Sequence, residues 1–305
     1  MIQGFSLGGE YGSSATYLSE MAGAKRRGFW SSFQYVTLIA GQLVALALLL
    51  ALQATLGEAA LEAWGWRIAF VVGALLAVVV FVIRRRLTET PSFEALATVR
   101  PRSSGANLLR DHPREALLVM ALTAGGTLAF YAYTTYMQKY LANSVGFDRA
   151  TASRIMTVAL ALFMLLQPVA GWISDRVGRK PVMIAFGVAG ALLTVPIFTA
   201  LERAKDPLTA FGLVMASLVI VTGYTSINAV VKAELFPGHI RALGVALPYA
   251  IANTVFGGTA EYVALWLKQA GHEHFFYYYV AGMIALSLVT YVTMRETKAT
   301  SLIRE

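Results

Sequence analysis

Charged residues at the ends of apolar segments are the residues of this chain that could do chemistry. The segment 171–181 reads GWISDRVGRKP and brings Asp175, Arg179 and Lys180 close together between two apolar stretches. Ion pairs between such side chains can form and break as the flanking helices move, and a network of them can bias an equilibrium where one exposed pair cannot. The segment therefore predicts a tight cytoplasmic turn that acts as the hinge of a gate.

A second pattern of charged residues occurs twice: an acid, a base seven positions later and a tyrosine fifteen positions after the acid. The two occurrences are Glu20, Arg27 and Tyr35, and Glu234, Arg241 and Tyr249. The repeat predicts two related halves. We expect the Glu20–Arg27 and Glu234–Arg241 pairs to join the charges of 171–181 in a cytoplasmic gate. The alternative is that the bases only set membrane topology, which requires no acids.

Polar side chains within the apolar segments form the candidate binding site. A membrane carboxylate is costly, so Glu10 is a candidate proton-coupling residue, or else a structural acid paired with a base on an absent helix. Arg67 can hold a substrate carboxylate in a bidentate pair, or can anchor its helix at the interface beside two tryptophans. The uncharged candidates for substrate binding are Gln34, Tyr35, Tyr131 and Asn228. Each of these could instead make an interhelical hydrogen bond.

Two further sets of polar residues lie near the ends of the predicted helices that face away from the cytoplasm. Glu261 and Lys268 are two helical turns apart, and we expect them to form a solvated pair. His272, Glu273 and His274 resemble a metal cluster but have no further ligands in their short loop, so we expect no metal and no cofactor. Catalytic motifs such as His-Glu-x-x-His are absent from the sequence. A membrane enzyme is therefore a remote alternative, and no residue is predicted to be catalytic.

The composition indicates a membrane protein. Of 305 residues, 57% are hydrophobic and 14% are charged, whereas about a quarter are charged in soluble domains. Nine apolar segments have about the 20 residues of a membrane-spanning helix, which predicts an all-α integral membrane fold. They run approximately over 2–21, 30–52, 66–83, 115–137, 152–172, 181–201, 209–231, 243–265 and 275–294. Lys and Arg divide 18 to 7 between alternate loops, which places the C-terminus in the cytoplasm. The net charge of +8 then reflects topology and does not indicate nucleic-acid binding.

The spacing of the segments predicts four parts. These are a three-helix remnant of an N-terminal bundle at 1–86, a cytoplasmic linker at 87–114, a six-helix bundle at 115–294 and a cytoplasmic tail at 295–305. Within the linker, Asp111 is expected to cap the next helix. Because the repeat aligns the first segment with the seventh, three helices should precede the first. We therefore expect a chain that is truncated at its start.

Residues 3–12, QGFSLGGEYG, and 15–20, ATYLSE, resemble the fourth helix of the metabolite:proton symporter group of the major facilitator superfamily. Residues 171–181 resemble the superfamily's Gly-Asp-Arg-Gly-Arg loop. The resemblance implies a monomeric twelve-helix transporter, here without its first three helices, in the bilayer of the bacterial cytoplasmic membrane. It also implies proton-coupled uptake of alpha-ketoglutarate or a related dicarboxylate by alternating access. The alternative is an inactive truncated transporter or a mis-assigned start.

Overall fold

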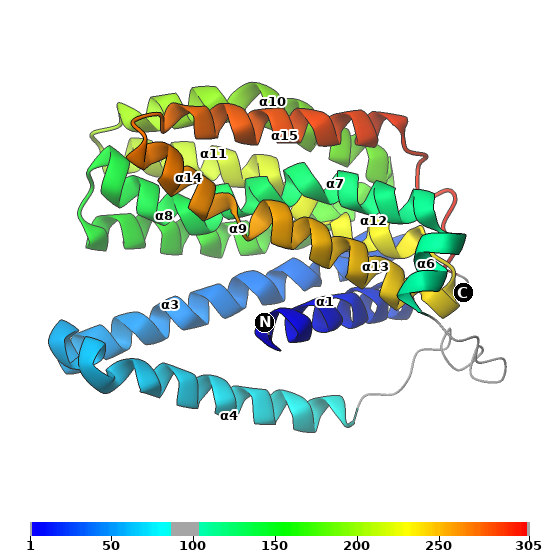
Figure 1. Cartoon of the computed structure of the whole chain (residues 1–305), viewed down its shortest axis with the longest axis horizontal. Coiled ribbons are helices and arrows are strands. Elements are labelled where there is room, and N and C mark those ends of the chain that lie inside the picture. Colours follow the sequence, from blue (N-terminus) through cyan, green and yellow to red (C-terminus); the bar gives the residue numbers. More distant parts are fainter. Residues whose placement is uncertain (1, 87–103, 304–305) are drawn as a thin grey trace.

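The computed structural model describes residues 2–86 and 104–303, and every regular element within these ranges is a helix (Figure 1). The α-helices are α1 (Ile2–Met21), α2 (Arg27–Ser31), α3 (Phe33–Ala60), α4 (Trp66–Arg84), α6 (Gly105–Asp111), α7 (Pro113–Tyr131), α8 (Met137–Tyr140), α9 (Arg149–Val177), α10 (Arg179–Glu202), α11 (Pro207–Thr225), α12 (Asn228–Glu234), α13 (Gly238–Ala252), α14 (Ala260–Gln269) and α15 (His274–Thr293). The π-helical segments are η2 (Leu61–Gly65), η3 (Ala132–Tyr136), η4 (Leu141–Val145) and η5 (Asn253–Gly257). A 3₁₀ turn, η1 (Ala24–Arg26), precedes α2.

Eight helical stretches of the described residues are long and apolar enough to cross a membrane. They correspond to eight of the nine predicted segments, and α1 covers the ninth. Helix α1 is less apolar than the others because it carries Glu10, Glu20 and a series of serines and glycines. The predicted all-α membrane fold is confirmed.

The prediction of a loop at 171–181 is wrong for most of its length. Helix α9 continues to Val177, and α10 begins at Arg179, so Gly178 alone makes the turn. The helix can continue because Ser174 and Asp175 are buried and accept hydrogen bonds from Arg179. Gly178 has a φ of 99°, in the region where a side chain strains the backbone.

The helices form two groups that lie side by side (Figure 1). Helices α7 to α15 pack into one bundle, and α1 to α4 lie along one side of it. Helix α1 packs against α12 and α13, whereas α2 and α3 pack against α9. Helix α4 lies at the lower edge of the view and exposes apolar side chains such as Phe70 and Leu75. Such a surface is compatible with lipid acyl chains.

The predicted linker is partly helical. Residues 87–103 lie outside the described residues, so the linker and the boundary at 86 remain predictions. Residues Gly105–Asp111 form α6, which Ser104 caps by accepting a 3.1 Å hydrogen bond from the Asn107 N–H. Asp111 is the last residue of α6, and His112 precedes Pro113 at the start of α7. The predicted Asp111 cap is therefore wrong, because this short helix was not expected.

Candidate functional site

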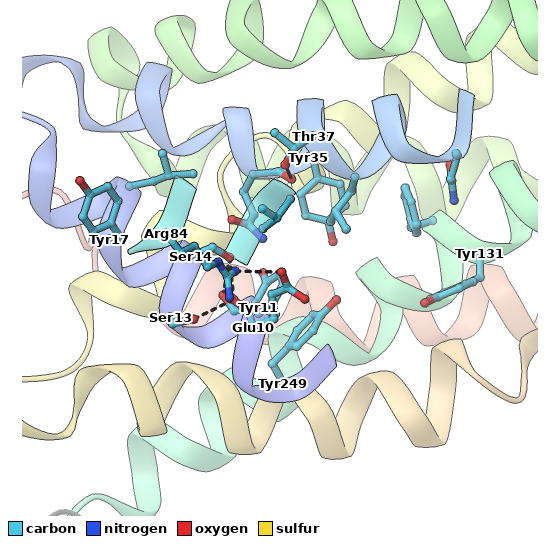
Figure 2. Close-up of a pocket in the computed structure, with 16 residues that line it drawn as sticks. Glu10, Tyr11, Ser13, Ser14, Tyr17, Tyr35, Thr37, Arg84, Tyr131 and Tyr249 are labelled. Atoms are coloured by element: carbon cyan, nitrogen blue, oxygen red, sulfur yellow. Dashed lines mark hydrogen bonds and ion pairs between the residues drawn. The ribbon is translucent and has the colours of Figure 1, made fainter. Parts of the chain in front are cut away.

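A cavity of about 880 Å³ lies between the two groups of helices. Its size falls within the roughly 300–1,000 Å³ of small-molecule sites. Residues of α1, α3, α4, α7 and α13 line it, and Figure 2 shows how they converge. The lining residues are Glu10, Tyr11, Ser13, Ser14, Tyr17, Leu18, Gln34, Tyr35, Thr37, Leu38, Gln42, Val80, Arg84, Phe130, Tyr131 and Tyr249. The wall is thus rich in hydroxyl groups and aromatic rings.

One ion pair lies in the wall. Arg84, at the end of α4, donates to the Glu10 carboxylate of α1 at 2.8 Å (Figure 2). Both side chains are about half exposed, 48% and 50%, so the pair stabilises the fold by only about 0–1 kcal/mol. An anionic ligand could therefore compete for Arg84 at low cost. The expectation that a base on an absent helix pairs with Glu10 is wrong, because Arg84 of this chain does so. The role of Glu10 in proton coupling remains a prediction.

The cavity contains most of the predicted binding residues. Gln34, Tyr35 and Tyr131 all line it. Asn228 lies one layer behind, where its Oδ1 accepts a 2.7 Å hydrogen bond from the Tyr11 hydroxyl. Their convergence from three helices was not evident from the sequence, and their roles in substrate binding remain predictions.

Arg67 lies outside this cavity. Its side chain is exposed near the start of α4 and stacks over the Trp66 ring, with the guanidinium carbon 4.5 Å from the ring centroid. It also donates to the Ala63 carbonyl at 3.3 Å. These contacts are those expected of an interfacial anchor.

Sequence reasoning missed two basic residues of this region. Arg84 was placed just beyond the predicted apolar segment 66–83, but it lies at the end of α4 and lines the cavity. Lys232 was assigned to a cytoplasmic loop, but it lies on α12 and is fully buried. The signal available for Lys232 was its four-residue spacing from Asn228, which puts both side chains on one helical face.

The charges predicted for the gate form a single buried cluster. The charge cluster consists of Glu20, Arg27, Asp175, Arg179, Glu234 and Arg241, with side chains no more than 5% exposed. Arg179 pairs with Asp175 at 2.8 Å and with Glu234 at 3.7 Å. Among the residues that the structure describes, Lys180 joins through its backbone N–H, which donates to Glu296 at 2.9 Å.

Ion pairs of the charge cluster connect the two copies of the repeat. Arg241 of the second copy pairs with Glu20 of the first, and Arg27 of the first lies 4.0 Å from Glu234 of the second. Within each copy the arginine Nε donates at 3.1 Å to the carbonyl of the residue before the glutamate, Ser19 or Ala233. This matching geometry supports the predicted repeat. The pairs hold the two groups of helices together at one end.

Asp175 anchors the N-terminus of α2. Its two carboxylate oxygens accept hydrogen bonds of 2.8 Å from the backbone N–H groups of Gly28 and Phe29. A carboxylate is favourable there because those N–H groups have no intrahelical partner and the N-terminal end of the helix dipole carries a partial positive charge. Asp175 therefore joins α9 to the first group of helices.

The C-terminal segment 294–303 completes the charge cluster, which was not predicted. Glu296 accepts from the backbone N–H of Arg179 at 2.8 Å, and Thr297 donates to Glu234 at 2.7 Å. Arg241 donates to the Leu302 carbonyl at 2.8 Å. The acid and hydroxyls of RETKATS were the available signal, but their partners are more than sixty residues away in the sequence.

The predicted Glu261–Lys268 pair is wrong. Glu261 pairs with Lys139, whereas Lys268 lies 3.8 Å from Glu273. Glu273 also accepts hydrogen bonds from Tyr136 and Ser144. Within residues 2–86 and 104–303 no group of acids and histidines has the arrangement of a metal site.

This arrangement can be compared with known proteins. The sequence profile of the family described as "Sugar (and other) transporter" matches residues 1–104 and 94–304. The chain belongs to this family. It is 52% identical to the alpha-ketoglutarate permease of Escherichia coli K12, over 98% of this chain and 69% of the permease.

Other relatives are named for different solutes. The chain is 34% identical to the citrate-proton symporter of Klebsiella pneumoniae, over 88% of this chain and 61% of the symporter. It is 29% identical to the proline/betaine transporter of E. coli K12, over 97% and 61% of the two chains. The chain thus spans less than two thirds of the length of these two relatives.

Solved structures support the same fold. The proton:xylose symporter XylE of the major facilitator superfamily aligns with a TM-score of 0.77, over 95% of this chain and 69% of XylE. The two sequences are 20% identical, so this similarity concerns the fold alone. The predicted major-facilitator-type fold is confirmed, and the chain is a multi-pass membrane transporter by family.

Proposed function

We propose that this chain takes part in proton-coupled uptake of alpha-ketoglutarate or a related dicarboxylate by alternating access. The observation that carries the proposal is the 52% identity to a permease of that name over almost the whole chain. The cavity supports it, because a guanidinium, an amide and several tyrosine hydroxyls can bind carboxylate and keto oxygens. We place the transporter in the bacterial cytoplasmic membrane as a monomer, with the charge cluster and the C-terminus on the cytoplasmic side.

The charge cluster suits the inner gate of such a transporter. Its Arg27–Glu234 and Arg241–Glu20 contacts join the two groups of helices at one end. Two of its contacts are long: Arg179 and Arg27 lie 3.7 and 4.0 Å from Glu234, beyond hydrogen-bond distance. Among the described residues, Arg179 Nη2 and Glu234 Oε1 make no hydrogen bond. A network with such contacts can separate at a smaller cost than one with every hydrogen bond formed.

Uptake by the full chain tests the proposed function. In membrane vesicles with an inward proton gradient, we expect uptake of labelled alpha-ketoglutarate that collapses when a protonophore removes the gradient. Excess unlabelled dicarboxylate should compete, whereas betaine should not. Background uptake by a chain shown to be inserted in the membrane would contradict the proposal. Equal competition by betaine would contradict the proposed substrate class.

Two arginines of α4, Arg84 in the cavity wall and Arg67 outside it, give a matched pair of variants. Arg84→Gln should weaken apparent affinity for alpha-ketoglutarate about tenfold, the loss expected for one charge-assisted hydrogen bond. Arg67→Gln should change it by no more than about twofold, because Arg67 lies outside the cavity. Concentration-dependent uptake measures both. The reverse order of effects would assign the substrate carboxylate to Arg67.

A further inference from the structure

Lys232 is a buried cation next to the cavity. It lies on α12 and is 0% exposed. No carboxylate within residues 2–86 and 104–303 lies within 4.0 Å of its ammonium nitrogen Nζ. Burial of a charge without an opposite charge is costly. The burial of this cation therefore needs a physical explanation, and binding of an anionic ligand is one.

The polar neighbours of Lys232 are fixed in position. Its Nζ donates to Asn228 Oδ1 at 2.8 Å and to the Tyr11 hydroxyl at 3.3 Å. The helix is interrupted between α11 and α12, and Asn228 Nδ2 donates to the carbonyls of Tyr224 and Thr225 at the end of α11. The amide group therefore cannot turn away, and its oxygen points at the ammonium.

Aromatic rings surround the rest of the ammonium. Its Nζ lies 4.2 Å from the Tyr249 ring centroid, 5.2 Å from that of Tyr11 and 5.9 Å from that of Tyr224. The faces of such rings attract a cation weakly. The site thus tolerates a positive charge but does not neutralise it.

A stacked pair of rings separates this lysine from the cavity. Tyr11 and Tyr249 stack with centroids 3.7 Å apart, and both line the cavity while both contact Lys232. Tyr11 belongs to α1 and Tyr249 to α13, so the stack joins the two groups of helices (Figure 2). Movement of one group relative to the other would part the rings and open a path from the cavity to the ammonium.

We propose that Lys232 binds one carboxylate of the transported dicarboxylate, and that the Tyr11–Tyr249 stack covers it until the two groups of helices move apart. This inference rests on the proposed function. The second carboxylate then has Arg84 available in the cavity wall. Two separate cations would select substrates with two carboxylates over those with one.

Equilibrium binding to the purified full chain tests this inference. The ligands are alpha-ketoglutarate and two analogues that each lack one of its carboxylates, 2-oxopentanoate and 4-oxopentanoate. Lys232→Met should weaken the binding of alpha-ketoglutarate and of one analogue by about 30-fold. This is the scale expected for removing one member of a buried charge pair. The affinity for the other analogue, which lacks the carboxylate that Lys232 binds, should change by less than about threefold. Equal weakening of all three ligands, or none, would overturn the inference.

A second variant keeps the lysine and neutralises it. Asn228→Asp places a carboxylate beside the ammonium, where it would compete with the ligand, so the same analogue pattern is expected. A purely structural lysine would gain stability from this change without a change in ligand preference. Thermal unfolding of each variant shows that it folds. If the unaltered chain binds no alpha-ketoglutarate, the proposed function fails; if it binds and the variants keep its preference, only the role of Lys232 fails.

Discussion

Glu234→Gln is expected to open the end of the molecule that the charge cluster closes. The substitution removes the carboxylate that lies near both Arg27 and Arg179 and leaves those guanidinium groups buried. Loss of one partner of a buried ion pair costs about 3–5 kcal/mol. Asp175 still pairs with Arg179, so we expect the lower end of that range. A change of this size shifts an equilibrium between closed and open arrangements by roughly a hundredfold.

Labelling of a single introduced cysteine measures the opening. The chain has no cysteine of its own, so Ser31→Cys provides a unique thiol at a buried position of α2, where the Ser31 hydroxyl lies 3.4 Å from that of Ser19. In the Glu234→Gln background the roughly hundredfold shift should let maleimide modify this thiol at least about ten times faster than in the parent. The proposed gate would be wrong if the rate did not change.

Glu261→Gln is the matched control for this substitution. It makes the same chemical change in the pair with Lys139, whose side chains are 33% and 49% exposed. Exposed pairs contribute about 0–1 kcal/mol, so the labelling rate of Cys at position 31 should stay near that of the parent. A similar acceleration in both variants would show that the effect does not come from the charge cluster.

Gly12→Ala is expected to force the two groups of helices apart. An added methyl group at this position would overlap Ala246 Cβ and would lie 2.8 Å from the Ala242 carbonyl oxygen, both on α13. Neither atom belongs to a flexible side chain, so the backbone must shift. Such overpacking costs about 1–3 kcal/mol. The melting temperature in detergent should fall, and uptake should fall with it.

Gly9→Ala provides the control on the same helix. Nothing lies within 4 Å of the methyl group that it adds, and Ala is favoured over Gly in a helix by about 0.5–1 kcal/mol. The melting temperature should therefore rise slightly. The expected changes in melting temperature are thus opposite at two glycines that lie three residues apart. Equal effects would show that the contact between α1 and α13 does not limit stability.

Several features of the fold followed from the sequence alone. The nine apolar segments correspond to the helices because a membrane helix needs about 20 consecutive apolar residues, a local property. The repeat of Glu20, Arg27 and Tyr35 at Glu234, Arg241 and Tyr249 indicated two related halves. The structure supports that repeat through matching arginine contacts to Ser19 and Ala233.

Helix ends were predicted less well. Segment 171–181 was predicted to be a loop because its charges suggested solvent, yet buried partners let α9 continue to Val177. Likewise, Lys232 was assigned to a cytoplasmic loop because it directly follows the predicted apolar segment 209–231. Its burial depends on Asn228 and on tyrosines from α1, α11 and α13. Local composition does not report such distant neighbours.

The sequence by itself determined the class of protein, the number of apolar segments and the residues that could carry charge between them. Only the tertiary structure decided which charges meet. It paired Glu20 with Arg241 and Arg27 with Glu234, placed Arg84 in the cavity wall and left Arg67 outside it. The physical reason is that the length of an apolar segment can be read directly from consecutive residues. An ion pair depends instead on the distance between two side chains, and in these two pairs the residues are more than two hundred positions apart in the sequence.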